Sequence, residues 1–421
     1  MKILVLGSGG REHALAWKIA RSPLVEKVYC APGSDGMSTD ATPLLNERSI
    51  SNPIAMADLA EKLAVGLTVV GPEAPLVAGV ADEFASRGLP IMGASRGAAQ
   101  LEGSKIFAKQ FMQRHKIPTA PFVVATDLAQ ARAAIGGFGF PVVIKADGLA
   151  AGKGVVVAQD QASALEAVES MFGGGLGDAG RRVVIEQFIP GEEMTFMIIA
   201  DIERYVSLAP TQDHKALHDG DRGPNTGGMG AYCDDAIIER LGGDALRRRI
   251  LDNIVAPTLA GMLAEGAPFR GILYFGLMVV NGEPHLLEYN VRFGDPETQA
   301  LLSRMESDIV PLLMGQFDRP PTWLPGASVC VVMTSGGYPG PFMRGMKIYG
   351  LNEANALPRV KVFHAGTQLE GDRFVTHGGR VLGVTALGVS LPDAISRVYE
   401  AVEKIRFEGM HYRKDIGAKG V

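Results

Sequence analysis

The first hundred residues alternate short apolar runs with stretches whose apolar residues recur at helical spacing. This order of strand, helix and strand predicts a doubly wound α/β arrangement, a parallel sheet with helices on both faces. Ligands bind such a sheet at the carboxyl ends of its strands, so the loops that follow the strands are the candidate binding segments. Strands are expected at residues 3–6, 25–30, 67–70 and 89–92, and helices at residues 12–21, 56–64 and 77–87.

Beyond residue 103 the pattern predicts an α+β region and then longer strands. Ser104 caps an expected helix at residues 105–115. The α+β region is expected to hold helices at 127–134 and 163–171, a glycine-rich loop at 173–180 and a strand at 183–188. The proline-rich residues 320–325 predict a linker before a β-rich segment with a closing helix at 391–406. We therefore expect an N-terminal α/β domain (1–103), a central domain (104–121 and 191–326), a small α+β domain (122–190) and a β-rich C-terminal domain (327–421).

Composition and charge exclude several classes of protein. The 421 residues are 47% hydrophobic and 21% charged, which is typical of a soluble globular protein. A net charge of −5 argues against a nucleic-acid partner. Met1 begins a short strand rather than a signal peptide, and no apolar run is long enough to span a bilayer. Because Cys30, Cys233 and Cys330 are far apart in the sequence, we expect buried free thiols, a cytoplasmic location and no membrane partner.

A hairpin rich in glycine and lysine is the strongest local signal. Residues 142–144 and 155–157 are β-branched runs that predict strands. The loop between them carries three glycines and is flanked by two lysines: Gly148, Gly152, Gly154, Lys145 and Lys153. Such a loop can turn its N–H groups onto a polyphosphate. It is not a Walker loop, because the spacing is one residue short and a strand follows instead of a helix. The alternative is an ordinary hairpin with solvated lysines.

Three glycine-bearing loops follow predicted strands of the N-terminal sheet, at residues 7–13, 31–36 and 71–76. The first opens a helix, and Arg11 and His13 there suit a sugar phosphate. A nicotinamide site is disfavoured, because Glu12 replaces a glycine of the dinucleotide fingerprint and no carboxylate follows the second strand. The alternative for each loop is a tight turn without a ligand.

Two further segments carry polar groups that suit a nucleotide or a substrate. Residues 185–193 place carboxylates after a strand, where they could accept ribose hydroxyls, and the backbone at Phe188 and Ile189 could recognise adenine. The alternative is a solvated acidic turn. Residues 212–218 and 225–232 are too polar and too rich in glycine for a core, which predicts a site or a mobile flap.

The segment Leu-Leu-Glu-Tyr-Asn-Val-Arg at residues 286–292 is the second strong signal. Glu288, Asn290 and Arg292 alternate along an expected strand and therefore share one face. Two oxygen ligands beside a cation suit magnesium held together with substrate phosphates. The alternative is a polar strand edge that faces solvent, which the neighbouring Asp295 and Glu297 make less attractive.

Taken in order, these motifs resemble those of the ATP-grasp enzymes. The closest resemblance is to the phosphoribosylamine–glycine ligase (glycinamide ribonucleotide synthetase) family of purine biosynthesis. It runs from residue 1 into the C-terminal segment. The motifs that carry it are residues 7–13, 70–76, 145–154, 213–215, 225–232 and 290–299.

This resemblance implies an ATP-grasp core that follows a pre-ATP-grasp domain, with residues 122–190 as a lid. It implies that ATP phosphorylates the carboxylate of glycine, and that the amine of 5-phospho-D-ribosylamine attacks the resulting glycyl phosphate. The products would be N1-(5-phospho-D-ribosyl)glycinamide, ADP and phosphate. ATP would be the co-substrate and Mg²⁺ or Mn²⁺ the metal. The expected partners are small molecules, and we expect a monomer that allows transient contact with the preceding enzyme of the pathway.

The resemblance also implies roles for individual residues. The catalytic residues would be Arg292, Lys145 and Asp295, and the metal ligands Glu288 and Asn290. ATP would contact Lys105, Lys145, Gly152, Lys153, Glu186, Phe188, Ile189 and Glu193. Glycine and the ribosylamine would contact Gly9, Gly10, Arg11, Glu12, His13, Gly71, Pro72, Glu73, Asp213, Lys215, Asn225, Thr226, Gly227, Gly228, Arg292 and Asp295. The glycine loops at 148–154 and 173–180 would be the moving parts.

One departure and several rival functions stand beside this interpretation. Many ATP-grasp enzymes carry a further metal carboxylate one strand earlier, where this chain has Gly276. The nearest rivals are another ATP-grasp carboxylate–amine ligase and a carboxylase that uses bicarbonate. The motifs at 213–215 and 225–232 argue against the carboxylase. A nicotinamide oxidoreductase and a nucleotide-binding regulator without catalysis are the rivals from other classes.

Overall fold

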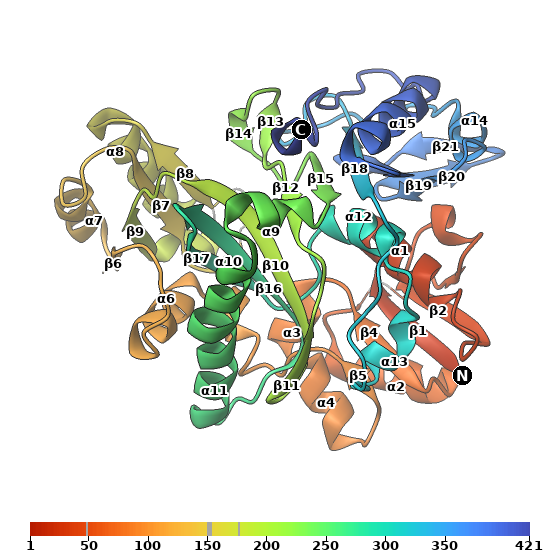
Figure 1. The fold of residues 1–421 in the computed structure, drawn as a ribbon, viewed down its shortest axis with the longest axis horizontal. Helices are drawn as coiled ribbons and strands as arrows, with labels where there is room; N and C mark the ends of the chain where they lie inside the picture. Colours follow the sequence, from red (N-terminus) through yellow and green to blue (C-terminus); the bar gives the residue numbers. More distant parts are fainter. Residues whose placement is uncertain (48, 150–153, 176) are drawn as a thin grey trace.

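The structure, a computed structural model, describes the chain except for residues 48, 150–153 and 176 (Figure 1). The N-terminal strands and helices lie on one side of the molecule, and the small sheet that contains β7 and β8 lies on the opposite side. A long sheet runs between them and continues into the C-terminal segment, which is drawn in blue.

The N-terminal sheet is parallel, as the alternating pattern predicts, with the strand order β3-β2-β1-β4-β5. Its strands are β1 (Lys2–Gly7), β2 (Lys27–Pro32), β3 (Thr42–Pro43), β4 (Leu67–Val70) and β5 (Ile91–Met92). The flanking helices are α1 (Gly10–Ile19), η1 (Asp35–Met37), α2 (Pro53–Leu63), α3 (Glu73–Ala78) and α4 (Val80–Ser86). The prediction of one helix at 77–87 is wrong. Gly79, with φ +91°, separates α3 from α4, because the left-handed region interrupts a right-handed helix.

The small α+β region holds a four-stranded antiparallel sheet with the order β6-β9-β7-β8. Its strands are β6 (Phe122–Ala125), β7 (Val142–Ala146), β8 (Val155–Ala158) and β9 (Val183–Gln187), with helices α7 (Leu128–Ile135) and α8 (Gln161–Ser170). The predicted loop at 173–180 is instead two helical turns, η2 (Met171–Gly175) and η3 (Gly177–Arg181). Gly174 and Gly177 have positive φ, which glycine adopts without steric cost.

The long sheet has the order β17-β16-β10-β12-β15-β18-β22-β19, and β11 pairs with β10. Its strands are β10 (Glu192–Asp201), β11 (Arg204–Ser207), β12 (Thr211–Asp213), β15 (Gly230–Cys233), β16 (Arg270–Val280), β17 (Glu283–Asn290), β18 (Ala327–Thr334), β19 (Val360–His364) and β22 (Arg380–Gly388). Because β15 pairs with β18, residues on both sides of the expected boundary at 327 share one sheet. The division into four domains stays a prediction.

The remaining elements of the described chain connect these sheets. They are α5 (Gln100–Gly103), α6 (Lys105–Arg114), the hairpin strands β13 (Ala216–His218) and β14 (Arg222–Asn225), α9 (Ala236–Leu241), α10 (Gly243–Ile250), η4 (Leu251–Val255), α11 (Ala256–Ala264), α12 (Glu297–Arg304), α13 (Ile309–Leu313), α14 (Leu351–Asn355), β20 (Thr367–Glu370), β21 (Arg373–Thr376), α15 (Leu391–Lys404) and η5 (Ala418–Gly420). The strand predicted through Arg292 ends at Asn290. The N–H of the next residue, Val291, donates to the carboxylate of Glu102 at 2.8 Å instead of to the neighbouring strand, so the strand pairing stops there.

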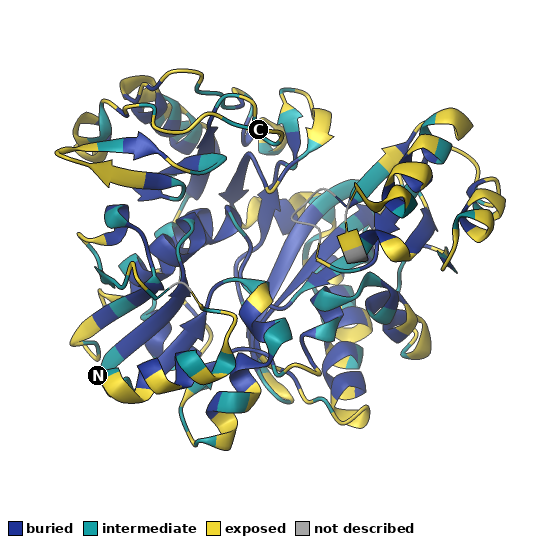
Figure 2. Cartoon of the chain, turned by 180° about the vertical axis from the view of Figure 1, so that it is seen from behind, coloured by how far each residue is buried: buried dark blue, intermediate teal, exposed yellow. Residues whose placement is uncertain are grey.

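The sheets form the core, and the exposed residues gather on the outer helices (Figure 2). Cys30, Cys233 and Cys330 are buried free thiols, as predicted. Within the described ranges, no helix combines the length and the apolar character that crossing a membrane requires.

Candidate active site

A cavity of about 1150 Å³ lies where the small sheet, the long sheet and the N-terminal unit meet. Its wall is largely apolar where β7, β8 and the segment after β9 contribute. Residues there include Val143, Val155, Val157, Phe188 and Ile189. The wall contributed by the N-terminal and C-terminal segments carries the polar side chains of Arg11, Glu73, Tyr338 and Arg380. One continuous cavity can therefore hold a flat apolar group on one side and charged groups on the other.

The lysine of the first hairpin strand meets the long sheet directly. Lys145 Nζ donates to the carbonyl of Leu287 at 3.1 Å, so the hairpin and the segment around Glu288 lie side by side. The ammonium groups of Lys145 and Lys109 also pair with the buried carboxylate of Glu186. Burial opposes the charged form of Glu186, but these two lysines outweigh it and lower its pKa. The side chain of Glu186 is thus committed to the lysines, and its contact with adenine stays a prediction.

Lys105 begins α6, and its position depends on the start of the hairpin loop. Its Nζ donates to the carbonyl of Gly148 at 3.2 Å, and Ser104 caps the helix by accepting from Phe107 N. Asp147 accepts from Ser104 Oγ at 2.8 Å and therefore fastens the loop to the helix. The predicted phosphate contacts of Gly152 and Lys153 lie outside the described residues, as do the middle positions of the expected moving loop.

Lys215 lines the cavity and lies between two carboxylates. Its ammonium pairs with Glu193 and lies 3.4 Å from Glu288 Oε1. Burial opposes the charged form of Glu288. The positive charges of Lys215, Lys145 and Lys105 prevail and lower its pKa to about 2. Glu288 is therefore an anionic oxygen donor at any physiological pH, which suits a divalent cation.

Only two metal ligands, Glu288 and Asn290, were predicted, and both line the cavity. Among the described residues, no group of three or more His, Cys, Asp and Glu side chains is arranged to hold a metal ion. Gly276 stands opposite Glu288 in the β16–β17 ladder, and a Cβ added there would come within 3.1 Å of Glu288 Cγ. A carboxylate side chain at position 276 would therefore crowd Glu288.

Arg292 is held by residues from two other segments. Its Nη2 lies 2.8 Å from Oε1 of the buried Glu102 and donates to Asn290 Oδ1 at 3.1 Å. Its Nε lies 3.4 Å from Glu73 Oε2. Burial opposes the charge of Arg292, but Glu102 and Glu73 more than compensate and raise its pKa. These contacts fix a permanently cationic group beside the two predicted metal ligands.

Two buried acids, Asp213 and Glu297, have pKa values raised by burial. Burial raises the pKa of Asp213 well above its ordinary value, although Lys215 opposes this. Burial likewise raises the pKa of Glu297, although its hydrogen bond with Tyr274 opposes this. Asp213 Oδ1 is buried, and none of the described groups donates a hydrogen bond to it. A buried acceptor without a donor is costly, so this atom suits a ligand that brings N–H groups.

Asp295 is held by Arg380 of the C-terminal segment and by Gln299 of α12. Arg380 Nη2 lies 2.9 Å from Asp295 Oδ2, and Gln299 Nε2 donates to Oδ1 at 2.8 Å. Arg380 also donates to the carbonyl of Gly227, whose own N–H donates to Tyr338 Oη at 2.9 Å. Burial opposes the charged form of Asp295, but Arg380 and Arg11 hold its pKa below the usual value.

The N-terminal loop is partly closed by its own side chains. Gly9 N donates to Glu12 Oε2 at 2.6 Å, and Arg11 Nε pairs with Glu12 Oε1. His13 Nε2 lies 3.1 Å from Asp40 Oδ2, and its Nδ1 accepts from the N–H of His364 at 2.8 Å. Arg11, Pro72 and Glu73 line the cavity. The described lining residues do not include Gly9, Gly10, Glu12, His13, Gly71 and Gly228. The contacts of these residues with a substrate stay a prediction.

Several residues that line or support the cavity escaped sequence analysis. Glu102 precedes the cap at Ser104, and nothing in its local pattern marks it. Arg380 follows two glycines, as Arg11 does, and that repeated Gly-Gly-Arg pattern is the one available signal. Lys109 and Tyr338 had no signal, because each is brought to the cavity by tertiary contacts.

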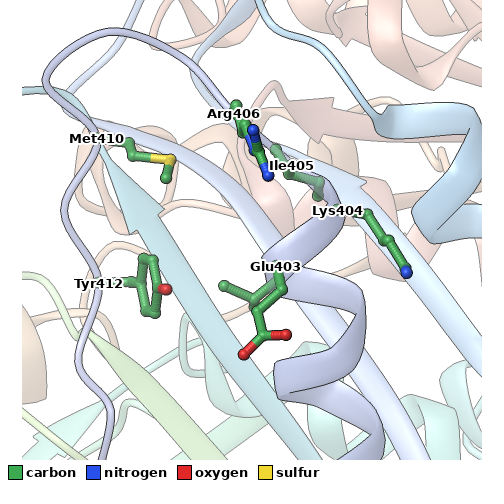
Figure 3. Close-up of a pocket in the computed structure, with 7 residues that line it drawn as sticks. Glu403, Lys404, Ile405, Arg406, Met410 and Tyr412 are labelled. Atoms are coloured by element: carbon green, nitrogen blue, oxygen red, sulfur yellow. The ribbon is translucent and has the colours of Figure 1, made fainter.

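A second pocket, of about 540 Å³, lies in the C-terminal segment and shares no lining residue with the cavity (Figure 3). It is bounded by the end of α15 and the chain that follows it. Its lining residues are Val402, Glu403, Lys404, Ile405, Arg406, Met410 and Tyr412. None of them belongs to a motif singled out in the sequence.

Comparison with known proteins gives full-length matches. Models of the phosphoribosylglycinamide synthetase family match at residues 1–102 (N domain), 103–298 (ATP-grasp, or A, domain) and 328–419 (C domain). The phosphoribosylamine–glycine ligases of Allochromatium vinosum and Pseudomonas aeruginosa are each 49% identical to the chain. Those alignments cover 100% of this chain and 99% and 98% of the relatives.

Solved structures share the architecture. The crystal structure of phosphoribosylamine–glycine ligase from Thermotoga maritima matches with a TM-score of 0.84 and 33% identity, and covers 99% of this chain and 100% of that one. A biotin carboxylase from Campylobacter jejuni, solved as a β-γ-ATP complex, matches with a TM-score of 0.73 over 99% of this chain and 94% of its own. At 16% identity this second match shows a shared fold alone. Together they confirm the predicted α/β architecture with an ATP-grasp core.

Proposed function

The chain belongs to the phosphoribosylamine–glycine ligase family, and from that premise we propose that it joins glycine to 5-phospho-D-ribosylamine with the use of ATP. The products are N1-(5-phospho-D-ribosyl)glycinamide, ADP and phosphate, a step of purine biosynthesis. One observation carries the proposal: Lys145 Nζ donates to the carbonyl of Leu287, so the β7–β8 hairpin lies against the strand that bears Glu288. A triphosphate between them would end beside Arg292.

We place ATP across the apolar wall and the lysines. The backbone at Phe188 and Ile189 would hold adenine, and Glu193 the ribose hydroxyls. Lys105 and Lys145 would meet the phosphates, because both ammonium groups lie in the cavity wall beside the hairpin. Burial and the neighbouring Lys145 lower the pKa of Lys105, so an anionic phosphate would favour its charged form.

The oxygen atoms of Glu288 and Asn290 fit magnesium. Both side chains are hard oxygen donors, and Glu288 remains ionised. Two protein ligands leave the remaining positions to phosphate oxygens and water, and Mn²⁺ would accept the same donors. When bound, the ion neutralises negative charge on the phosphoryl oxygens.

The first step would be phosphoryl transfer to glycine. A carboxylate oxygen of glycine attacks the γ-phosphorus while the bond to the bridging oxygen breaks, which releases ADP and forms glycyl phosphate. Arg292 and Lys145 would stabilise the charge on the transferring group, since their positions are fixed by Glu102, Glu186 and the backbone before the substrate arrives.

Glycine would be held by its ammonium group. Asp213 Oδ1 is a buried acceptor without a donor, and Glu297 is the second buried acid of this region. An ammonium placed between them would supply the missing donors and lower both raised pKa values. The glycine carboxylate would then point toward Arg292 and the γ-phosphate.

The second step would be attack by the ribosylamine. Its nitrogen bonds to the acyl carbon while the bond from that carbon to the phosphate oxygen breaks, and the departing phosphate takes up the proton that the nitrogen loses, which leaves the amide. Asn225, Thr226 and Gly227, with Asp295, would orient the sugar, and Arg11 beside the loop at Pro72 and Glu73 would meet its phosphate. Because Arg380 and Gln299 already occupy both carboxylate oxygens of Asp295, and Arg380 holds its pKa below the usual value, we propose that it accepts hydrogen bonds from the substrate rather than removing the proton.

No macromolecular partner is needed for this chemistry. We propose that the protein works as a monomer in the cytoplasm, with at most transient contact with the enzyme that supplies phosphoribosylamine. The monomeric state, the location and the transient contact are proposed because the substrates are small molecules of purine biosynthesis, and no surface of the molecule is used as an argument for them.

Coupled measurement of ADP release tests the proposal. We expect ADP release that requires ATP, glycine and freshly generated phosphoribosylamine together, and that stops when either substrate is omitted. Bicarbonate is the matched control for glycine. ADP release that bicarbonate supports equally well, or that is indifferent to phosphoribosylamine, would assign the chain to a carboxylase or another ligase.

A further inference from the structure

A small hairpin reaches the cavity at both of its strand ends. Lys215 immediately precedes β13, and Asn225 is the last residue of β14. The two strands pair through Ala216 and Asn225, and Thr226 donates from both its N–H and its hydroxyl to the carbonyl of Lys215 at 2.8 Å. Any change in the shape of this hairpin therefore moves Asn225 and the turn that follows it.

The largest fully buried side chain of the described residues is Arg413, and it lies against this hairpin. Its Nε and Nη2 each donate to the carboxylate of Asp415 at 2.7 Å. Its Nη1 donates to Asp221 Oδ1 at 2.9 Å and to the carbonyl of Ala216 at 3.2 Å. A buried guanidinium is tolerated only when such partners satisfy it, so the arginine and the hairpin specify each other's positions.

The chain on either side of Arg413 makes further contacts with the hairpin. His411 Nε2 lies 3.0 Å from the carbonyl of Leu217, and Lys414 N donates to Asp219 Oδ1 at 2.8 Å. The N–H of Gly220 donates to Asp415 Oδ2 at 2.8 Å. Lys419, which lines the cavity, pairs with Asp221. Figure 1 shows the end of the chain beside β13 and β14.

The hairpin cannot supply this order by itself. A two-stranded hairpin is at best marginally stable in water, and β13 and β14 have only 3 and 4 residues. Residues 219–224 are largely exposed, so apolar packing contributes little at the tip. The contacts of residues 411–419 therefore supply the shape of the hairpin.

We propose that Arg413 is a positioning residue for the amine substrate. It acts through Ala216 and Asp221 to hold Asn225 and the turn at Thr226–Gly228 against the cavity. This inference rests on the proposed function, which assigns that turn to phosphoribosylamine. Lys215 is also held by Glu193, so the nucleotide side depends less on the hairpin.

The test compares Arg413→Gln and Arg413→Lys with Arg397→Gln. Arg397 pairs with Asp393 within α15 and serves as the matched control from the same segment. We expect Arg413→Gln to raise KM for phosphoribosylamine about tenfold while KM for ATP changes less than twofold, with Arg413→Lys intermediate. Hydrogen exchange should accelerate in residues 216–225 and remain unchanged in β7 and β8.

An unchanged KM for phosphoribosylamine in folded Arg413→Gln would overturn the inference, as would an equal rise in Arg397→Gln. If Arg413→Gln does not fold, Asp415→Asn replaces it in the test, because this variant keeps Arg413 and removes the negative charge of one of its partners. That variant should show a smaller rise in KM for phosphoribosylamine and faster hydrogen exchange in residues 216–225. If Asp415→Asn shows neither effect, the proposal is refuted. If the unaltered protein ignores phosphoribosylamine, the proposed function fails, while hydrogen exchange still tests whether Arg413 orders the hairpin.

Discussion

The guanidinium of Arg292 lies 2.8 Å from the carboxylate of Glu102, which comes from a short helix almost two hundred positions earlier in the chain. The other oxygen of Glu102 accepts the N–H of Val291, so one buried carboxylate orients both the backbone and the side chain of this segment. Because Arg292 faces the cavity, Glu102 determines where that positive charge points.

Replacing Glu102 with glutamine tests this orientation. Glu102→Gln keeps the size of the side chain and an oxygen acceptor for Val291, but removes the charge that pairs with Arg292. We expect kcat to fall about 10- to 100-fold, the range seen when supporting residues are lost, with KM for ATP changed less than twofold. Steady-state kinetics measure this. Glu83→Gln, which alters a surface pair with Arg87, is the control and should behave like the unaltered protein.

Removing the guanidinium itself should have a larger effect. For Arg292→Ala we expect kcat to fall about 1000-fold, because a fixed cation in a desolvated site stabilises developing charge. Nucleotide affinity, measured by equilibrium binding, should fall far less. Turnover close to that of the unaltered protein would show that Arg292 does not act on the transferring phosphoryl group.

Glu288→Gln should raise the magnesium requirement. The variant keeps the oxygen but loses the negative charge that holds the cation, so half-maximal activity should need about tenfold more Mg²⁺ at fixed ATP. The measurement is a titration of activity with magnesium chloride. Glu283→Gln alters an exposed carboxylate on the same strand and is the matched control. Equal requirements in the two variants would remove Glu288 from the metal site.

Buried histidines should make the protein less stable in mild acid. Burial lowers the pKa of His214 and of His364, each to about 3, and also lowers that of His13. Below pH 6.5 the unfolded chain binds protons that the folded chain does not. His214 and His364 therefore each remove about 1.4 kcal/mol of unfolding free energy per pH unit as pH falls from 6.5 toward 3.

Urea unfolding at pH 7.0 and pH 5.5 measures this loss. We expect His214→Gln to show a smaller decrease between the two pH values than the unaltered protein, because one of the proton-binding groups is gone from the unfolded state. His285 is only partly buried and is the matched control. His285→Gln should leave the decrease unchanged, and a flat profile in the unaltered protein would contradict the expectation.

Local pattern was sufficient wherever neighbouring residues in the chain carry the signal. The apolar runs around Lys145, the alternation of Glu288 and Asn290 and the order of N-terminal strands and helices all appear in the structure where they were predicted. The prediction was less accurate where a single backbone feature decides. Gly79 divides one expected helix, and the bond from Val291 to Glu102 ends β17 before Arg292.

What the sequence determined by itself was the order of most N-terminal strands and helices and the segments that bear chemistry, because periodicity, glycines and charged residues act over a few neighbouring positions. Tertiary structure alone decided which of these groups meet. It paired His13 with Asp40, and it brought Arg380 to Asp295 and Arg413 to the β13–β14 hairpin. These pairings join residues far apart in the chain. Their geometry is set by the packing of whole sheets and helices, which no short stretch of sequence encodes.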